Sequence, residues 1–280
     1  VLPMSISILF QLPKLFFSIK KEEKTKKSII ESYNIDGVIS DNRYGCYSKK
    51  IPCVFITHQL QIKSPIFQKF IQKINYHFIQ KFTECWVVDD KQINLAGSLS
   101  KPNILPKKTN YIGVLSRFKK TPTEKKYKIL AIVSGPEPQR TTIEKKLILE
   151  LQNIKEKSLI VLGKPEKKYT KKINNLTIKS FLDSKALNLA IESAEIIICR
   201  SGYSTIMDLK KLGKKAILIP TPGQTEQEYI AERLFKKGIC YMQKQKAIDL
   251  NLAINESEKY SGFETTKNEN TDWEKLFSLF

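Results

Sequence analysis

The stretch that decides the fold is residues 192–239, ESAEIIICRSGYSTIMDLKKLGKKAILIPTPGQTEQEYIAERLFKKGI. It contains two apolar runs, Glu195–Cys199 and Ala216–Ile219, and each is followed by a polar loop and then by a helical pattern. Short apolar runs that alternate with helices are typical of parallel strands covered on both faces. The stretch therefore predicts an α/β fold with a parallel sheet.

The same order of strand, loop and helix extends along the rest of the chain. The other predicted strands are Gly37–Ser40, Cys53–Thr57, Cys85–Val88, Tyr111–Gly113, Ile129–Val133, Leu159–Leu162 and Leu176–Ile178. The predicted helices of the second half are Arg140–Gln152, Ser184–Ser193, Ser204–Leu212 and Glu226–Lys237. We therefore expect two Rossmann-like lobes with parallel sheets.

A polar, lysine-rich segment separates the two halves. Residues 116–128, SRFKKTPTEKKYK, contain Pro122 and have the composition of a domain boundary. We assign residues 1–118 to an acceptor-side N-terminal lobe, 119–127 to a linker, 128–250 to a C-terminal lobe, and 251–280 to a tail with a short terminal helix.

The composition favours ordinary hydrophobic cores and argues against nucleic-acid binding. Hydrophobic residues make up 41% of the chain, and no uncharged apolar run is long enough to span a membrane. The net charge is +20, but only five of the 48 basic residues are arginines, which usually grip phosphates and base edges. We interpret most lysines as a solvated surface, with an anionic membrane surface as the alternative.

The five cysteines form no CxxC pair, and four of them lie in or beside apolar runs. A free thiol in such a place packs as a small hydrophobe. We therefore expect a reducing compartment, no disulfide and no zinc site.

Three polar loops follow strands of the second half, at the edge where open α/β sheets bind ligands. The first is Ser134–Arg140, SGPEPQR, which precedes a helix whose free N–H groups suit an anion. An ordinary tight turn would also favour Gly and Pro here, so this loop alone does not identify a ligand site.

The second loop spans residues 199–208, CRSGYSTIMD. Its small hydroxyl residues and Gly202 suit phosphate at a helix start, and Asp208 lies one helical turn beyond Ser204, where it can accept from a ligand hydroxyl. An ordinary helix start, with Ser204 as N-cap and Asp208 as a dipole partner, fits the spacing as well.

The third loop, residues 220–228 (PTPGQTEQE), is stiffened by two prolines. A capping box of Thr225 with Glu228 would explain part of it without a ligand. Three such loops at the carboxyl ends of strands would border one crevice, and that coincidence favours a ligand site.

The stretch 192–239 resembles the donor-binding half of family 28 glycosyltransferases. The best-known members of that family, the MurG-like enzymes, add N-acetylglucosamine to a lipid-linked peptidoglycan precursor. The likeness is specific over residues 127–243 and looser over 34–118. It implies a GT-B fold, a UDP-sugar donor, a lipid-linked or glycan acceptor, and inversion at the anomeric carbon. It also implies no cofactor, no essential metal, no nucleic-acid partner, and a place in the cytoplasm or at the inner face of the membrane.

The resemblance also implies roles for individual residues. Those matching the two phosphate-side turns are Ser134, Gly135, Gln139, Arg140, Arg200, Ser201, Gly202, Ser204 and Thr205. Phe181 and Leu182 resemble the segment whose backbone reads the uracil edge, and Asp208 lies where the family has a Glu that bonds the ribose. The residues matching the sugar-binding loop are Gln224, Thr225, Glu226 and Gln227.

Two positions depart from the family pattern. Asp208 is one methylene shorter than the family's Glu, which would alter the ribose geometry. Ile230 stands where many members have Asn, so one contact to the sugar is expected to be missing.

Polar clusters follow two predicted strands of the first half. Asp41, Asn42 and Arg43 follow one strand, and His58 and Gln59 follow the next, so we expect them on the acceptor side. The other histidine, His77, lies in the helical pattern 67–82, which leaves His58 as the candidate base. A structural role for this loop histidine is the alternative.

The start of the chain differs from the family pattern. The family's glycine-rich opening loop, which carries its usual base candidate, has no match after Val1. We therefore expect an incomplete N-terminal lobe and a chain that binds donor but transfers sugar slowly or not at all by itself. The apolar run Met4–Phe17 is expected to form a surface helix or a membrane-facing edge.

The expected reaction is direct displacement. A base would deprotonate the acceptor hydroxyl, and helix N-termini with Arg140 or Arg200 would stabilise the departing diphosphate. Two alternatives stay open. One is a UDP-sugar epimerase of the same fold, which normally needs carboxylates and a His around the sugar, and the other is a donor-binding subunit that is active only with a partner chain.

Overall fold

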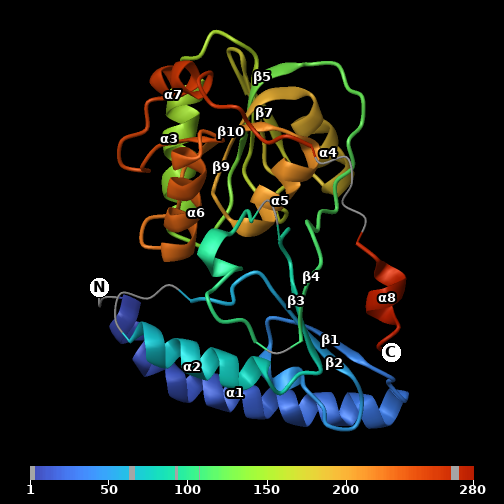
Figure 1. The fold of residues 1–280 in the computed structure, drawn as a ribbon. Helices are drawn as coiled ribbons and strands as arrows, with labels where there is room; N and C mark the ends of the chain where they lie inside the picture. Colours follow the sequence, from blue (N-terminus) through green and yellow to red (C-terminus); the bar gives the residue numbers. More distant parts are fainter. Residues whose placement is uncertain (1–3, 63–66, 92–93, 107, 266–270) are drawn as a thin grey trace. The chain divides into compact units, whose positions relative to one another are not determined.

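The chain divides into two α/β units, shown as ribbons in Figure 1. The computed structural model describes residues 4–62, 67–91, 94–106, 108–265 and 271–280, without the side chains of residues 4–13, 15 and 16. Unit 1 comprises residues 1–114 and 268–280, and unit 2 comprises residues 115–267. The segment 119–127, which the sequence indicated as a linker, therefore belongs to unit 2.

Unit 1 is built on a parallel sheet with the strand order β1-β2-β3-β4. The strands are β1 Val38–Asp41, β2 Cys53–Thr57, β3 Glu84–Val87 and β4 Thr109–Tyr111. The fourth strand ends earlier than the predicted Tyr111–Gly113, because Gly113 adopts a left-handed φ of 73° that interrupts extended backbone. The core of this unit includes Phe55, Leu60 and Phe82.

Two helices lie side by side in unit 1, α1 Met4–Tyr33 and α2 Gln68–Ile79 (Figure 1). The apolar run 4–17 was predicted to be helical, but α1 continues through the charged residues that follow it. The short helices η1 Tyr44–Cys46 and η2 Gly97–Leu99 complete the set. Gly45 is required where η1 meets α1, since a Cβ there would lie 2.6 Å from the carbonyl oxygen of Ile19.

The C-terminal segment packs on unit 1. Helix α8, Trp273–Phe277, places Phe277 with its ring edge toward the buried Trp86, with ring centroids 5.8 Å apart. Phe280 approaches the same indole at 6.4 Å, and Thr271 donates to the carbonyl oxygen of Ile112. The end of the chain therefore covers part of the core of the first unit.

A buried carboxylate organises the loop after β3. Asp89 is fully buried, and its oxygens accept from the backbone N–H groups of Asp90, Leu95 and Ala96 and from the hydroxyl of Ser100. A carboxylate that is satisfied by this many donors holds a loop in one conformation. Asp89 therefore has a structural role in this unit.

Unit 2 is built on a seven-stranded sheet with the order β11-β10-β9-β5-β6-β8-β7. The strands are β5 Tyr127–Ile132, β6 Ser158–Val161, β7 Thr170–Ile173, β8 Leu176–Lys179, β9 Ala194–Cys199, β10 Lys215–Leu218 and β11 Tyr241–Met242. The predicted parallel arrangement is found throughout, except that β7 pairs antiparallel with β8. The sequence did not indicate β7, because its residues TKKI are mostly polar and exposed.

The helices of unit 2 cover the sheet, and most follow the predicted ranges. They are α3 Gln139–Leu151, α4 Ser184–Glu192, α5 Tyr203–Leu212, α6 Thr225–Lys236 and α7 Leu250–Ser257. The core between sheet and helices includes Ile129, Leu147 and Ile198. Because the strands carry Val, Ile and Leu at successive positions, both faces of the sheet need such a cover.

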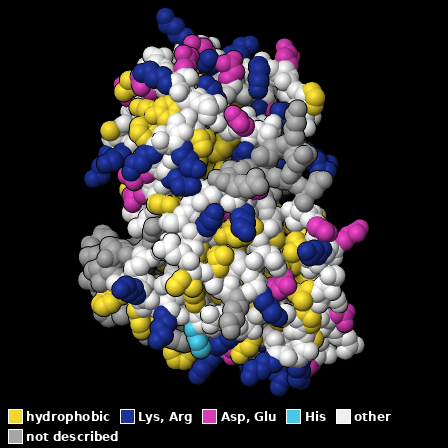
Figure 2. Space-filling view, viewed as in Figure 1, with side chains coloured by type: hydrophobic (Ala, Val, Ile, Leu, Met, Phe, Trp, Pro, Cys, Tyr) yellow, Lys and Arg dark blue, Asp and Glu magenta, His cyan; other side chains and the backbone are white. Residues whose placement is uncertain are grey.

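The charged side chains on the surface and the lengths of the apolar helical segments agree with the composition. Figure 2 shows Lys and Arg side chains over both units on the face that it displays, with Asp and Glu between them. No helix in the described part of the chain is both long and apolar enough to cross a membrane.

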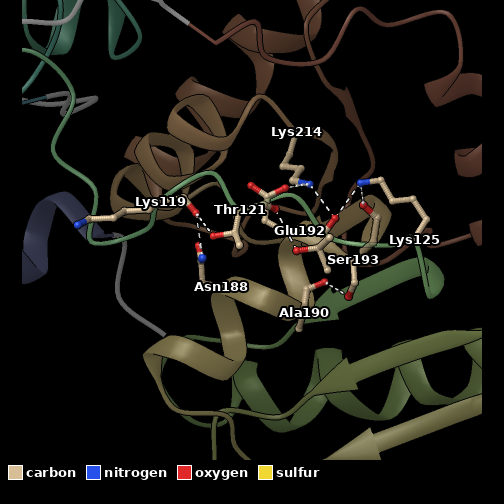
Figure 3. Close-up of polar contacts among 10 residues, drawn as sticks. Lys119, Thr121, Lys125, Asn188, Ala190, Glu192, Ser193 and Lys214 are labelled. Carbon is tan, nitrogen blue, oxygen red and sulfur yellow. Dashed lines mark hydrogen bonds and ion pairs between the residues drawn. The ribbon is translucent and has the colours of Figure 1, made fainter.

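Two lysines converge on the end of α4 in unit 2: Lys214 forms a buried ion pair there, and Lys125 fastens the segment before β5. Figure 3 shows Lys125 and Lys214 converging on Glu192, at the end of α4. Lys214 Nζ lies 2.7 Å from Glu192 Oε2, and both side chains are 7% exposed. Lys125 Nζ donates to the carbonyl oxygens of Glu192 and Ala194 at 2.8 and 3.1 Å, and burial lowers the pKa of this lysine.

We predict that Glu192→Gln lowers the free energy of unfolding by about 3–5 kcal/mol, because it leaves the charge of Lys214 buried without a negative partner. Glu195→Gln is the matched control. Glu195 pairs with Lys128 at 2.9 Å, but that pair is half exposed, so its loss should cost about 0–1 kcal/mol. Urea unfolding of the two variants measures both values, and equal losses would contradict the assignment.

Candidate functional site

The strand order of unit 2 creates a switch point between β5 and β9. From β5 the chain proceeds to β6 and β8 on one side, whereas β9, β10 and β11 are added on the other. Ligands of open α/β sheets bind beyond the carboxyl ends of the strands at such a point. The loops after β5, β9 and β10 all leave the sheet at this edge, and they contain most of the residues predicted for the site.

The loop after β5 turns at Gly135, whose φ of 109° strongly favours glycine. Arg140, in the first turn of α3, donates from Nε to Glu137 Oε1 at 2.9 Å and from NH1 to the carbonyl oxygen of Gly163 at 3.2 Å. Glu137 also accepts from the backbone N–H of Thr141. A carboxylate thus already lies at the start of α3, while Ser134 and Gly135 are exposed beside it.

The loop after β9 leads into α5 without a capping side chain. Gly202 is the N-cap residue, with an extended φ of −64° and ψ of 137°, and it has no side chain to accept from the helix. Ser204, which the alternative interpretation placed at the N-cap, lies inside the first turn and is exposed, with Thr205 beside it. A Cβ on Gly202 would meet no atom within 4 Å. Within the described residues no side chain caps α5, and Gly202 leaves space beside its first turn.

The loop after β10 leads into α6, and its side chains hold the loop itself. Gln224 is the N-cap residue and makes no capping bond, and Glu228 accepts from the backbone N–H of Gly223. Glu228 therefore does not form the predicted capping box with Thr225. Its carboxylate instead bonds Gly223 in the turn before α6. Two carboxylates, Glu226 and Glu228, lie in the first turn of α6, which suits hydroxyl groups better than phosphate.

Gln227 joins the second and third loops. Its amide oxygen accepts from the backbone N–H of Thr221 at 2.9 Å, and its carbonyl oxygen accepts from the hydroxyl of the buried Ser201 at 2.7 Å. Ile230, one turn further along α6, is fully buried in the core. The position where the family pattern has Asn is thus part of the hydrophobic interior here.

Arg200 is buried beneath these loops, with 2% of its surface exposed. Its two terminal nitrogens donate to the carbonyl oxygens of Ile219, Pro220 and Gln139 and to Gln245 Oε1. The guanidinium thus joins the ends of β9 and β10 to the start of α3 and to the segment after β11. Burial lowers the pKa of Arg200 to about 10, so the group stays charged at neutral pH.

Asp208 is held from outside its own helix. Ser116 Oγ donates to Asp208 Oδ1 at 2.5 Å, while Oδ2 makes no hydrogen bond within the described residues. Burial raises the pKa of Asp208, and the bond from Ser116 and the charge of Arg117 act in the opposite direction. The carboxylate is therefore oriented by the segment that enters unit 2, with one oxygen left for a ligand.

Phe181 and Leu182 follow β8 at the same edge of the sheet. Asp183 caps α4 by accepting from the N–H of Ala186, which fixes the backbone of the turn. Phe181 is partly exposed. Phe181 and Leu182 line a cavity of about 420 Å³ together with Tyr169, the residue before the antiparallel strand β7.

The predicted acceptor-side residues lie together in unit 1. Asp41 ends β1, and the next residue, Asn42, accepts at Oδ1 from the hydroxyl of Thr57 at the end of β2. His58 and Gln59 follow Thr57, and the N–H of Gln59 donates to the same hydroxyl. Arg43 differs from its neighbours, because its guanidinium pairs with Glu22 of α1 at 3.1 Å.

The described residues contain no group of three or more His, Cys, Asp or Glu side chains placed to hold a metal ion. All five cysteines are free thiols, and four of them are buried.

Two residues of this network were missed by the sequence analysis. Ser116 lay in a segment interpreted as a boundary, and nothing in its composition pointed to Asp208. Gln245 bonds both Arg200 and the side chain of Gln139, at 2.5 and 2.8 Å, but it lies far along the chain from both. Only the pairing of β10 with β11 brings it to the site.

Solved glycosyltransferase structures share this fold. A crystal structure of MurG from Acinetobacter baumannii matches with a TM-score of 0.53 at 13% identity, over 94% of this chain and 77% of that chain. The glycosyltransferase SnogD from Streptomyces nogalater matches with a TM-score of 0.56 at 13% identity, over 96% and 80%. The predicted GT-B fold is thereby confirmed.

The family follows from the second half of the sequence. Residues 131–276 match the model of the glycosyltransferase family 28 C-terminal domain. The chain belongs to glycosyltransferase family 28, and it is similar to the MurG-like members of that family.

Two curated relatives show how far the likeness extends. One from Buchnera aphidicola subsp. Schizaphis graminum is 28% identical over 221 residues, which are 74% of this chain and 57% of the relative. One from Trichlorobacter lovleyi is 40% identical over 67 residues, 23% of this chain and 17% of the relative. Both are named UDP-N-acetylglucosamine--N-acetylmuramyl-(pentapeptide) pyrophosphoryl-undecaprenol N-acetylglucosamine transferase. The chain thus spans little more than half the length of the first relative, and less of the second.

We predict that Gly202→Ser stabilises the protein but weakens UDP binding. A serine at the N-cap accepts from the first turn of α5, which should raise the free energy of unfolding by about 0.5–1 kcal/mol. The same hydroxyl competes with an anionic ligand for the N–H groups. Gly135→Ser is the matched control for stability. Because Gly135 has a φ of 109°, a serine at this position should lower the free energy of unfolding by about 1–3 kcal/mol. Thermal unfolding and calorimetry measure both effects, and unchanged UDP affinity in Gly202→Ser would argue against an anion at α5.

Proposed function

We propose that unit 2 binds a UDP-sugar, such as UDP-N-acetylglucosamine, and that the enzyme transfers the sugar to a lipid-linked or glycan acceptor with inversion and without a metal. The observation that carries this proposal is the uncapped N-terminus of α5 at the switch point of the sheet, with open space above Gly202. The names of the curated relatives support the choice of donor and acceptor.

In the proposed donor site, each loop binds a different part of the UDP-sugar. The diphosphate would lie over Gly135 and the first turn of α5, where Ser204 and Thr205 are accessible. Asp208 would accept from a ribose hydroxyl at Oδ2, and the backbone of Leu182 would meet the uracil edge. The carboxylate-rich start of α6, with Glu226, would hold sugar hydroxyls. Negative charge that develops on the leaving diphosphate would be stabilised by the fixed backbone dipoles of α5.

The acceptor hydroxyl needs a base, and we propose His58 for that role. A neutral imidazole has one ring nitrogen that can accept the proton of an acceptor hydroxyl. Asp41 and Asn42 end the neighbouring strand and would orient the acceptor. Direct attack of the deprotonated oxygen on the anomeric carbon, with departure of UDP, inverts that centre.

The proposal predicts nucleotide selectivity without a metal. UDP should bind at least about 10-fold more tightly than GDP or ADP, because a purine does not fit a pyrimidine edge-reading turn. Addition of EDTA should leave the affinity for UDP unchanged. Calorimetry with the three nucleotides, with and without chelator, checks both statements. Equal affinities would contradict the donor assignment, and loss of binding in EDTA would contradict metal independence alone.

A second prediction concerns Asp208. Asp208→Ala should weaken UDP binding by about 1.5–3 kcal/mol, the size expected for a lost hydrogen bond to a charged acceptor. Since protonation removes the charge of the acceptor, affinity for uridine should also fall as the pH drops through the pKa of Asp208, which burial raises above that of an ordinary aspartate. Uridine is chosen because it has no titrating phosphate. Retained uridine affinity in Asp208→Ala would assign this residue to the helix alone.

We also propose that the α1–α2 face of unit 1 meets an anionic membrane surface. Phe17 and Phe70 are exposed there, and a cavity of about 570 Å³ is lined by both helices, including Lys20, Lys73 and Lys81. Exposed rings flanked by lysines fit an interface between acyl chains and anionic headgroups.

Vesicle binding tests the proposed membrane face. The chain should sediment with phosphatidylglycerol vesicles and not with phosphatidylcholine vesicles. At about 1 kcal/mol for each basic residue, replacing Lys20, Lys73 and Lys81 by Gln should weaken binding about 100-fold. The matched control replaces Lys145, Lys167 and Lys244 of unit 2, and an equal loss in that variant would contradict the assignment.

A further inference from the structure

The hydrogen bonds of Arg200 leave its guanidinium almost no capacity to bind a ligand directly. NH1 donates to Ile219 and Pro220 at 3.0 and 3.1 Å, and NH2 donates to Gln139 and Gln245 at 3.3 and 2.5 Å. Four of the five N–H donors are thus used within unit 2. The fifth, on Nε, is buried and has no hydrogen-bond partner among the described residues.

The positive charge of this group has no negative partner among the atoms it touches. All four acceptors are neutral, three carbonyl oxygens and one amide oxygen. A buried charge without a counter-charge costs folding free energy, and an anion bound nearby would offset part of that cost. Burial lowers the pKa of Arg200, which agrees with a cation in an unfavourable environment.

The acceptors place this charge under the proposed diphosphate site. Ile219 and Pro220 begin the loop that leads to α6, and Gln139 begins α3. Arg200 itself is two residues before Gly202, the N-cap of α5. The guanidinium is therefore surrounded by the backbone of all three loops that the proposed function assigns to the donor.

We propose that Arg200 is a positioning residue that serves the diphosphate without touching it: the backbone of the three loops holds its guanidinium in the interior, and its unpaired charge is balanced by the anion that binds above them. This inference rests on the proposed function of the site. It differs from a surface cation that grips phosphate, because here the interaction passes through the protein interior, where it is screened little by salt.

The test separates charge from loop geometry by comparing two ligands and three variants. The affinity ratio of UDP to uridine isolates the contribution of the diphosphate. Arg200→Lys keeps the charge and loses the fork, Arg200→Gln keeps neutral donors and loses the charge, and Arg200→Met loses both. Asp208→Asn is the matched control, since it should weaken uridine and UDP alike and leave their ratio unchanged.

We expect the ratio to fall about 10-fold or more in Arg200→Gln and Arg200→Met, and to stay within about 3-fold of the unsubstituted chain in Arg200→Lys. An unchanged ratio in Arg200→Met would overturn the proposal. An equal fall in all three variants would also overturn it, because geometry alone would then account for the effect.

A measurement on the unsubstituted chain keeps the proposal testable if a variant does not fold. Between 0.05 and 0.5 M KCl, concentrations chosen for the assay to span roughly 14 to 4 Å of Debye screening, the ratio should change less than about 3-fold. A steep fall would assign the charge to exposed lysines and overturn the proposal. Absence of UDP binding to the unsubstituted chain would instead overturn the proposed function itself, and uridine binding without a preference for UDP would overturn this inference alone.

Discussion

The bonds of the Arg200 guanidinium to the backbone of neighbouring loops are the constraint on which the site of unit 2 depends. The loops after β9 and β10 and the start of α3 leave different strands, and each has its own turn chemistry. One planar group with fixed donors sets the separation of Ile219, Pro220 and Gln139. Ser201 and Gln227 add a second tie between the same loops. Hydrogen bonds within the protein thus hold these loops together.

The chemistry of that crevice comes mainly from the backbone. A helix N-terminus at a switch point offers N–H groups and a positive dipole end, and Gly202 leaves room for an anion to approach them. The three helix starts are not equivalent, however. Glu137 already occupies the start of α3, and Glu226 and Glu228 make the start of α6 acidic. This difference supports the proposal that phosphate lies at α5 and sugar hydroxyls at α6.

The sequence predicted the α/β fold, most strands of unit 2 and the edge of the sheet where the polar loops gather. Apolar runs such as Glu195–Cys199 are sufficient for that, because a strand buried on both faces has little freedom in composition. The strand β7 was missed because an exposed edge strand tolerates lysines. The partnership of Ser116 with Asp208 was missed because it joins residues that are distant in sequence. The sequence analysis singled out Arg200, but only the structure shows that its side chain is buried and that its N–H groups donate to carbonyl oxygens of the protein.

A crystal structure of the chain with UDP tests the central claim most directly. The account predicts diphosphate density over the first turn of α5, a ribose hydroxyl within hydrogen-bond distance of Asp208 Oδ2, and Arg200 still bonded to Ile219 and Pro220. Diphosphate density away from α5, or an Arg200 side chain that has left its carbonyl partners to contact a phosphate oxygen, would contradict it.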